Sequence, residues 1–409
     1  MIQQLLAFLD TRQERVIEWQ RAMTAIPALG PESGGEGERA KADYLLEVLR
    51  GLGITDIRTI DAPDPRVPCG HRPNIAARIP GKSSRTVWLI GHMDVVPPGD
   101  RALWHADPWT LQVDGDIITG RGVEDNQQAI VSGLLVAEAL LANKITPEHS
   151  LGLLFVADEE TGNKLGIGHV VKAAPELFGP DDFIVVPDFG TPDSTMVEVA
   201  EKSVLWLKVS VSGKQCHAST PGEGVNSLVA ASALILATPV LYEQFSAHDA
   251  LFSPPTSTFV PTKKEANVPN VNTVPGNDVF YIDCRVLPCY DLAHVQAAVR
   301  KLADDVERDY GVSIEISIVQ SEQAAPATPP DSAVVQSLTR AVAKVYGATC
   351  RPMGVGGGTV AAALRHKGLP VAVWATLVPN PHTPNETSRI SFTIGDAKVL
   401  ATMLCESAN

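Results

Sequence analysis

The sequence lacks several features that mark whole classes of protein. None of its six cysteines forms a CxxC pair, so we expect buried free thiols rather than a cysteine-type zinc site. Lys and Arg number 33 against 47 Asp and Glu, and this net charge of −14 argues against nucleic acid as a partner. No apolar run approaches the roughly 20 residues of a membrane span. The first residues, Met1–Trp19, have the apolar spacing of an amphipathic helix. They lack the basic and apolar regions of a signal peptide, so we expect a cytoplasmic protein.

The composition is that of a folded chain large enough for more than one core. The protein has 409 residues, of which 44% are hydrophobic and 20% charged. These fractions are typical of globular proteins. A single hydrophobic core rarely serves so long a chain, so the length predicts two domains.

The first half of the chain alternates short apolar runs with longer helical patterns. Val87–Gly91, Leu151–Ala157 and Phe183–Pro187 have the pattern of buried strands. Gly37–Leu52 and Gln127–Ala142 have the pattern of helices between them. This alternation predicts an α/β fold with a mixed, largely parallel sheet.

The pattern changes near Glu201. From there the expected order is strand, helix, two strands, helix and strand, which suits a small ferredoxin-like α+β domain. The expected elements are Val204–Gly213, Asn226–Ala237, Thr256–Thr262, Asp278–Leu287, Leu292–Tyr310 and Val312–Val319. After the Ala- and Pro-rich segment Gln323–Pro330 the α/β pattern resumes with a helix over Ser332–Tyr346 and a strand over Val371–Leu377. We therefore predict a discontinuous first domain, 1–201 and 322–409, with 202–321 inserted as a lid.

Residues that can bind metal follow the apolar strands. In α/β sheets active sites gather at the carboxyl ends of strands. His92 and Asp94, Glu159 and Glu160, Asp188, and His382 each follow one such run, and Asp125 lies in a Gly-rich segment before a helix. Each has an ordinary alternative: Asp125 with Gln128 resembles a helix capping box, and the Glu pair could be a solvated turn. Jointly, the residues favour a common site.

The residue types fit a pair of metal ions. Two His and three carboxylates are ligands that divalent metals such as zinc prefer. Five ligands exceed what one catalytic zinc needs, whereas two ions that share a carboxylate would use all five. Two such ions can activate a water and polarise a carbonyl.

At these residues the sequence resembles the M20 family of metallopeptidases and N-acyl-amino-acid deacylases, which includes acetylornithine deacetylase and aminoacylase. The matching segments are GHMDVVP (91–97), GRGVED (120–125), DEETG (158–162), PDFG (187–190) and PHTPNE (381–386). Their order and spacing agree over nearly the whole chain. The resemblance implies hydrolysis of an amide bond, in a peptide or an N-acyl amino acid, with two zinc ions (cobalt or manganese as alternatives).

The resemblance also implies roles for the residues. His92, Asp125 and Asp188 would hold one ion, and Asp125, Glu160 and His382 the other, with Asp125 as the bridge. Asp94 would orient the ring of His92. Glu159 would be the general base for the water between the ions.

The inserted segment carries further motifs of the family. GKQCHASTP (213–221) resembles a lid motif whose His, here His217, would stabilise the oxyanion in the same or the partner subunit. Asn272 and Arg285 match a second lid motif, and Arg285 could bind a substrate carboxylate or form a cross-strand salt bridge. Outside the inserted segment, the loop GVGGGTV (354–360) has Gly357, Gly358 and Thr359, which would bring backbone close to the substrate. The resemblance further implies a homodimer through the lid.

Two departures from the family pattern leave the substrate open. Asn126-Gln127-Gln128 replaces the stretch that usually follows the bridging Asp, and Val360 follows Thr359 where Ser or Asp is common. Asp188, rather than Glu, tilts the expectation towards peptidase chemistry. Two alternatives to the two-metal enzyme are a catalytically inactive relative that only binds a ligand and a protein with one metal.

Overall fold

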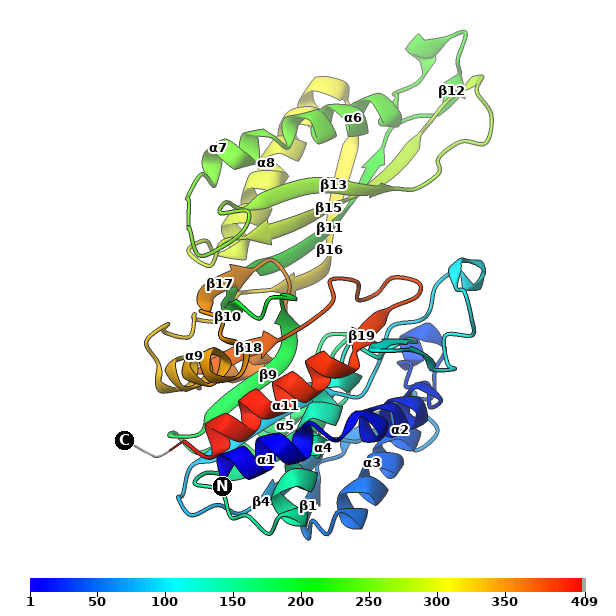
Figure 1. Cartoon of the computed structure of the whole chain (residues 1–409). Helices are drawn as coiled ribbons and strands as arrows, with labels where there is room; N and C mark the ends of the chain where they lie inside the picture. The colour runs from blue at the N-terminus through cyan, green and yellow to red at the C-terminus, as the bar shows by residue number, and fades with distance from the viewer. Residues whose placement is uncertain (407–409) are drawn as a thin grey trace. The chain divides into compact units, whose positions relative to one another are not determined.

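The structure, a computed structural model, describes residues 1–406 and consists of two compact units. The first comprises 1–199, 327–353 and the chain from 359 onward, and the second comprises 200–326 and 354–358. The segment Gly354–Gly358 thus belongs to the second unit, whereas the sequence-based boundaries assign it to the first. Each unit has a sheet of its own (Figure 1).

The first unit is built on an eight-stranded mixed sheet. Its order is β1 (Asp56–Thr59), β4 (Ile75–Ile79), β8 (Ser150–Val156), β5 (Thr86–His92), β9 (Phe183–Gly190), β18 (Val371–Ala375), β10 (Met196–Glu201) and β17 (Arg351–Val355). The central strands β8, β5, β9 and β18 are parallel, while β1, β4 and β10 pair antiparallel. This confirms the predicted α/β fold class with a mixed sheet.

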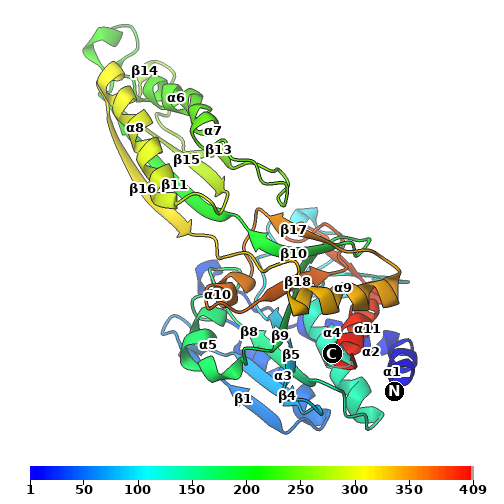
Figure 2. The ribbon, with the colours of Figure 1, turned by 90° about the vertical axis from the view of Figure 1, so that its left-hand side faces the viewer.

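Helices cover both faces of this sheet (Figure 2). On one side lie α1 (Ile2–Leu9), α2 (Gln13–Thr24), α4 (Gln127–Ala142), α9 (Ala333–Tyr346) and α11 (Ile390–Leu404), and on the other α5 (Ile167–Ala173) and α10 (Ala361–Arg365). A further helix, α3, spans Arg39–Gly51. Trp88 and Ile90 of β5 pack with Val170 of α5 and Leu364 of α10. With both faces covered, every residue of β5 is buried, which explains its unbroken apolar run.

The N-terminal amphipathic helix expected over Met1–Trp19 is two helices instead of one. The first ends at Leu9 and the second begins at Gln13. At the break, the hydroxyl of Thr11 donates to the carbonyl of Phe8 at 2.7 Å. Such local bonding competes with the helical pattern at Ser, Thr, Asn and Asp.

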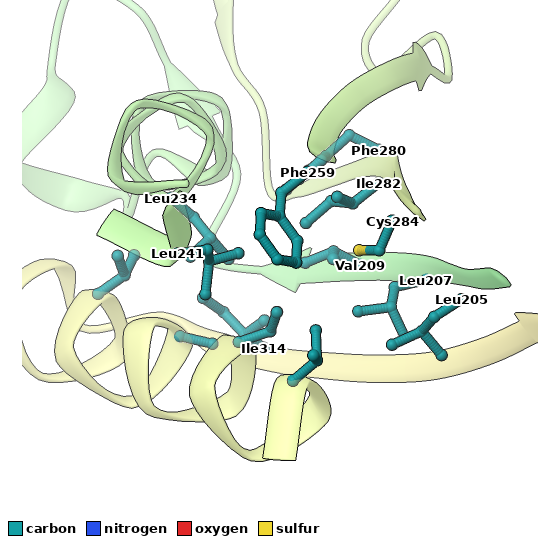
Figure 3. Close-up of a cluster of buried hydrophobic side chains, with 14 of the residues drawn as sticks. Leu205, Leu207, Val209, Leu234, Leu241, Phe259, Phe280, Ile282, Cys284 and Ile314 are labelled. Atoms are coloured by element: carbon teal, nitrogen blue, oxygen red, sulfur yellow. The ribbon is translucent and has the colours of Figure 1, made fainter. Parts of the chain in front are cut away.

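The second unit is an antiparallel sheet with helices on one face. Its elements follow the predicted order: β11 (Ser203–Ser212), α6 (Ser227–Ala237), β13 (Thr258–Lys264), β15 (Asn277–Val286), α8 (Leu292–Tyr310) and β16 (Ser313–Glu322). The sheet order is β13, β15, β11, β16. Alternate residues such as Leu205, Leu207 and Val209 point to a core shared with Leu234 and Phe259 (Figure 3). This confirms the ferredoxin-like architecture.

One stretch of the second unit is strongly apolar. By length and composition alone, Ser227–Gln244, with a mean hydropathy of 1.3, could cross a membrane. It consists of α6 and the short helix α7 (Val240–Gln244). Ala230, Ala231 and Leu234 of this stretch pack into the core of the unit, which accounts for part of its apolar character.

Candidate metal centre

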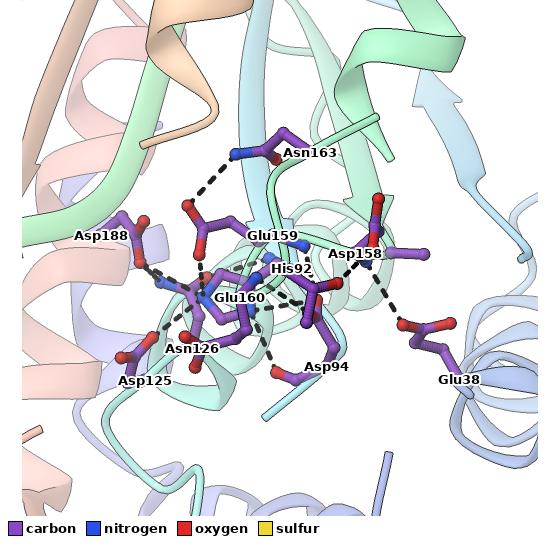
Figure 4. Close-up of polar contacts among 12 residues, drawn as sticks. Glu38, His92, Asp94, Asp125, Asn126, Asp158, Glu159, Glu160, Asn163 and Asp188 are labelled. Atoms are coloured by element: carbon purple, nitrogen blue, oxygen red, sulfur yellow. Dashed lines mark hydrogen bonds and ion pairs between the residues drawn. The ribbon is translucent and has the colours of Figure 1, made fainter. Parts of the chain in front are cut away.

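The metal-binding residue types converge at the carboxyl ends of neighbouring strands (Figure 4). His92 is the last residue of β5, and Asp188 lies near the end of β9, which pairs with β5. Glu159 and Glu160 follow β8, the other neighbour of β5. Parallel pairing therefore brings these side chains to one edge of the sheet. Asp125 lies just before α4, and His382 is in the loop between β18 and β19 (Thr387–Arg389).

One group of three side chains is largely buried. Nε2 of His92 lies 2.9 Å from Oδ1 of Asp125 and 3.5 Å from Oδ1 of Asp188. The three candidate ligand atoms lie within 4.8 Å of one another. The side chains of His92 and Asp188 are 2% and 10% exposed. The group has the residue types and the spacing to hold one divalent ion.

A second group shares Asp125 with the first. Its other oxygen, Oδ2, lies 2.9 Å from Nε2 of His382, which is 3.2 Å from Oε2 of Glu160. These candidate ligand atoms also lie within 4.8 Å of one another. The two oxygens of Asp125 thus face two different histidines, which is the arrangement that a bridging carboxylate requires.

Asp94 contacts both His92 of the first group and the two glutamates that follow β8. Nδ1 of His92 is 3.0 Å from the backbone oxygen of Asp94 and 3.5 Å from its carboxylate. The carboxylate accepts the backbone N–H groups of Glu159 and Glu160 at 3.1 and 3.0 Å. The backbone of Asp94 therefore has the closer contact with the His92 ring, and its side chain holds the two glutamates in place.

Burial makes the charged forms of two glutamates in this cluster unfavourable. Burial raises the pKa of Glu159 well above its ordinary value, and the positive His92 offsets this only in part. Burial and the neighbouring Asp125 raise the pKa of Glu160 to about 7. The carboxylates of Asp125 and Glu160 raise the pKa of His382 to about 10. Buried Oε1 of Glu160 has no hydrogen-bond partner within residues 1–406. The shifted pKa values and the unpaired oxygen of Glu160 fit a site that binds divalent metal ions.

The alternative of a simple helix cap for Asp125 is not supported. The N-cap of α4 is Asn126, and no side chain makes a capping bond there. Gln128 is engaged elsewhere: its Nε2 donates to the backbone oxygen of Thr376 at 2.8 Å and to Asp396 at 3.0 Å.

Asn126, which departs from the family pattern, contacts the first group directly. Its side-chain oxygen accepts the backbone N–H of His92 at 3.2 Å, and its Nδ2 donates to Asp188 Oδ1 at 2.6 Å. The sequence marks Asn126 as a departure from the family pattern but does not indicate this role. Its position next to Asp125 is the feature of the sequence that could have pointed to a role at the metal centre. The second departure, Val360, packs in the core between the sheet and α10.

The remaining predicted residues of the second unit lie in two places. His217 is exposed on β12 (Cys216–His217), which pairs with β14 (Thr273–Val274), and the backbone oxygen of the adjacent Asn272 accepts the N–H of Ala218 at 2.9 Å. Arg285 donates to Asp283 at 2.8 and 3.0 Å and to the backbone oxygen of Gly356 at 2.8 Å. The salt bridge of Arg285 therefore lies within β15 and is not the cross-strand salt bridge that the sequence analysis offered as an alternative, and Arg285 also bonds to the glycine loop.

The glycine loop itself presents little side chain. Gly357 and Gly358 are exposed, and neither would meet a neighbouring atom if a Cβ were added. The glycines are thus not required by packing. Thr359 is buried, and its hydroxyl accepts the N–H of Ala361 at the start of α10 at 3.1 Å.

Fold and site together define a metal-dependent hydrolase, and comparison with known proteins gives its family. The sequence pattern of Peptidase family M20/M25/M40 matches residues 88–406, so the chain belongs to this family. It is 36% identical over 415 residues to an uncharacterized metallohydrolase of Methanococcus maripaludis, covering 96% of this chain and 99% of the relative. A succinyl-diaminopimelate desuccinylase of Gluconobacter oxydans is 28% identical over 344 residues, 83% of each chain.

Solved structures share the fold at lower identity. Human carnosine dipeptidase 1 superposes with a TM-score of 0.80 at 18% identity, covering 99% of this chain and 98% of that one. An M20 family metallo-carboxypeptidase from Sulfolobus solfataricus superposes with a TM-score of 0.75 at 19% identity, covering 95% and 98%. The family predicted from the motifs is confirmed, and so is its class of metal-dependent hydrolases.

Proposed function

We propose that this hydrolase cleaves an amide bond with two divalent metal ions, zinc in the first instance. The observation that carries the proposal is the carboxylate of Asp125, whose two oxygens face the two histidines of the separate groups. When bound, such a pair of ions polarises a carbonyl and lowers the pKa of a water molecule. His92, Asp125 and Asp188 would hold one ion, and Asp125, Glu160 and His382 the other.

Glu159 is the residue that we assign to proton transfer. It stands next to the metal-binding Glu160 but belongs to neither group. Its Oε2 lies 4.0 Å from Nε2 of His92, and its backbone is fixed by Asp94. A carboxylate at this position can take a proton from the attacking water and return it to the leaving amine.

His217 suits the donor role that the family resemblance implies. The backbone N–H of Ser219 points to its Nδ1 at 3.2 Å, so Nδ1 acts as an acceptor. In the neutral ring the proton then resides on Nε2. A protonated Nε2 can donate a hydrogen bond to the oxygen that becomes negative during amide hydrolysis.

The substrate class we propose is a small peptide or an N-acyl amino acid. Relatives of known name include desuccinylases, and solved structures of the same fold include dipeptidases. Asp188 in the first group, where some family members have Glu, favours peptidase activity over deacylase activity. A catalytically inactive relative is disfavoured because all five candidate ligands and Glu159 are in place around one centre.

The test is to reconstitute the protein with zinc, count the metal, and screen dipeptides against N-acetyl and N-succinyl amino acids. Two metal ions per chain with turnover of one substrate class are expected. Glu159→Ala should retain both ions and lose about a thousandfold or more in turnover, because proton transfer contributes roughly 10²–10⁴. Absence of bound metal after reconstitution would exclude the proposal, and full activity of Glu159→Ala would exclude this base.

We also propose a cytoplasmic homodimer that forms through the second unit. Its edge strand β16 exposes Ile318 and Val319, at 52% and 54%. Apolar side chains on an open sheet edge are typical of a surface that another chain covers. Light scattering of the purified protein gives the mass directly, and a monomer would exclude this assembly.

A further inference from the structure

Glu386 is a buried acid close to the candidate metal centre that is not one of the proposed ligands. It ends the motif PHTPNE, four residues after His382, and is 0% exposed. Buried carboxylates are costly unless every oxygen is paired. Its partners therefore indicate what it does.

Four donors from one short loop converge on this carboxylate. Oε2 accepts the backbone N–H of Gly122 at 3.0 Å and Nη1 of Arg121 at 2.7 Å. Oε1 accepts the backbone N–H groups of Glu124 and Asp125 at 3.0 and 3.1 Å. Nearby backbone N–H groups that point at one anion form an anion-binding nest.

The shape of that loop depends on Gly122. Its φ of +83° lies in the left-handed region, and a Cβ there would stand 2.6 Å from Val95 and 2.9 Å from Gln127. Only glycine combines this φ with so close an approach. The loop is therefore folded around Glu386 by its own sequence, GRGVED.

Further bonds tie the same two segments together. Nη2 of Arg121 donates to the backbone oxygen of Thr383 at 3.3 Å, and the N–H of Gly120 donates to the backbone oxygen of Glu386 at 3.1 Å. The loop of 120–125 carries the candidate bridging ligand, Asp125. The loop of 380–386 carries His382.

We propose that Glu386 is a positioning residue that holds the Asp125 loop against the His382 loop, so that Asp125 faces both histidines. The inference rests on the proposed metal centre. A carboxylate suits this task because each of its oxygens accepts two of the four donors. A glutamine would turn an NH₂ group towards two of them and leave those donors unpaired.

If Glu386 only stabilised the fold, its loss would lower stability without weakening metal binding. A second buried ion pair of the chain provides the matched control. Glu198 is likewise 0% exposed and pairs with buried Arg365 at 2.8 Å, as Glu386 pairs with Arg121 at 2.7 Å. Neither Glu198 nor Arg365 belongs to the two candidate metal groups. Glu198→Gln therefore measures the loss of a buried ion pair that acts on Asp188 through its charge.

The experiment compares Glu386→Gln, Glu386→Asp and Glu198→Gln in three measurements without substrate: thermal melting, zinc affinity by chelator competition, and hydrogen exchange over 121–126. Both Gln variants should melt at a lower temperature. Only Glu386→Gln should lose about 10- to 100-fold in zinc affinity, the usual cost of altering a residue behind a metal ligand. It alone should exchange faster over 121–126, and cobalt bound in place of zinc should show an altered visible spectrum.

Several results would overturn the proposal. One is equal zinc affinity and equal exchange in Glu386→Gln and the wild type. Should Glu386→Gln fail to fold, Glu386→Asp decides, because its shorter side chain keeps the charge but reaches fewer donors: unchanged affinity and exchange overturn the proposal. Rapid exchange over 121–126 in the wild type overturns it whatever the variants do. Exchange needs neither metal nor substrate, so this failure is distinguishable from failure of the proposed hydrolase function.

Discussion

The two halves of the candidate metal centre share Asp125 and differ most in their histidines. His92 and Asp188 come from two paired strands, and their side chains are 2% and 10% exposed. His382 comes from a loop, with a φ of 61°, and its side chain is 53% exposed. The strand-borne half is braced by Asn126 and Asp94, whereas the loop-borne half depends on the loop that Glu386 anchors. Glu160 of the second half is itself only 9% exposed, so the histidine is what sets that half apart from the core.

The largest effect is expected for His92→Ala, which breaks the buried half. In the metal-free protein His92 offsets the charges of Asp125 and Asp188, so its removal leaves buried acids without a partner. The free energy of unfolding should fall by about 3 kcal/mol, as for other broken buried pairs. Denaturant unfolding measures this, and metal analysis should find at most one ion. Unchanged stability would contradict the idea that this half belongs to the core.

His382→Ala tests the other side of the comparison. Removing this half-exposed side chain also removes its ion pairs with Asp125 and Glu160, which solvent weakens, so we expect the metal-free protein to lose about 1 kcal/mol of stability. Turnover and the second ion should nevertheless be lost. Melting and metal content, measured on the same preparation as His92→Ala, check both points. A large drop in stability would show that the two halves are not distinct.

The smallest effect is expected for Asn126→Asp. A carboxylate would replace the amide that donates to Asp188 at 2.6 Å, and repulsion should weaken zinc binding at the buried half by about 10- to 100-fold. Gln128→Glu is the matched control, since Gln128 donates to Asp396 in the same way, at 3.0 Å, away from the ligands. Competition with a chelator measures both variants. Equal losses would mean that the bond to Asp188 has no special role.

The sequence was most informative where a local pattern meets a strong physical constraint. The apolar run of β5 ends at His92 because a strand covered on both faces must leave its polar residue at the end. The bounds of α4 and α8 were predicted to the residue. The break between α1 and α2 was missed, since the apolar spacing continues across it and only local bonds of Thr11 and Arg12 mark it.

Contacts between distant segments could not be predicted in this way. That Asn126 braces Asp188, or that Glu386 lies beneath the Asp125 loop, depends on segments 62 and 261 residues apart meeting in space. No periodicity or composition encodes such a meeting. Arg285 illustrates the same limit: its bond to the glycine loop spans 71 residues.

The sequence alone determined the fold class, the family and the set of candidate ligands, because each rests on local patterns: buried runs, helical spacing, and short motifs at strand ends. Only the tertiary structure decided how the ligands divide into two groups, one with a buried histidine and one with an exposed histidine, and which residues hold them. The physical reason is that burial and charge balance at one atom depend on everything packed around it, and most of those neighbours are remote in the chain.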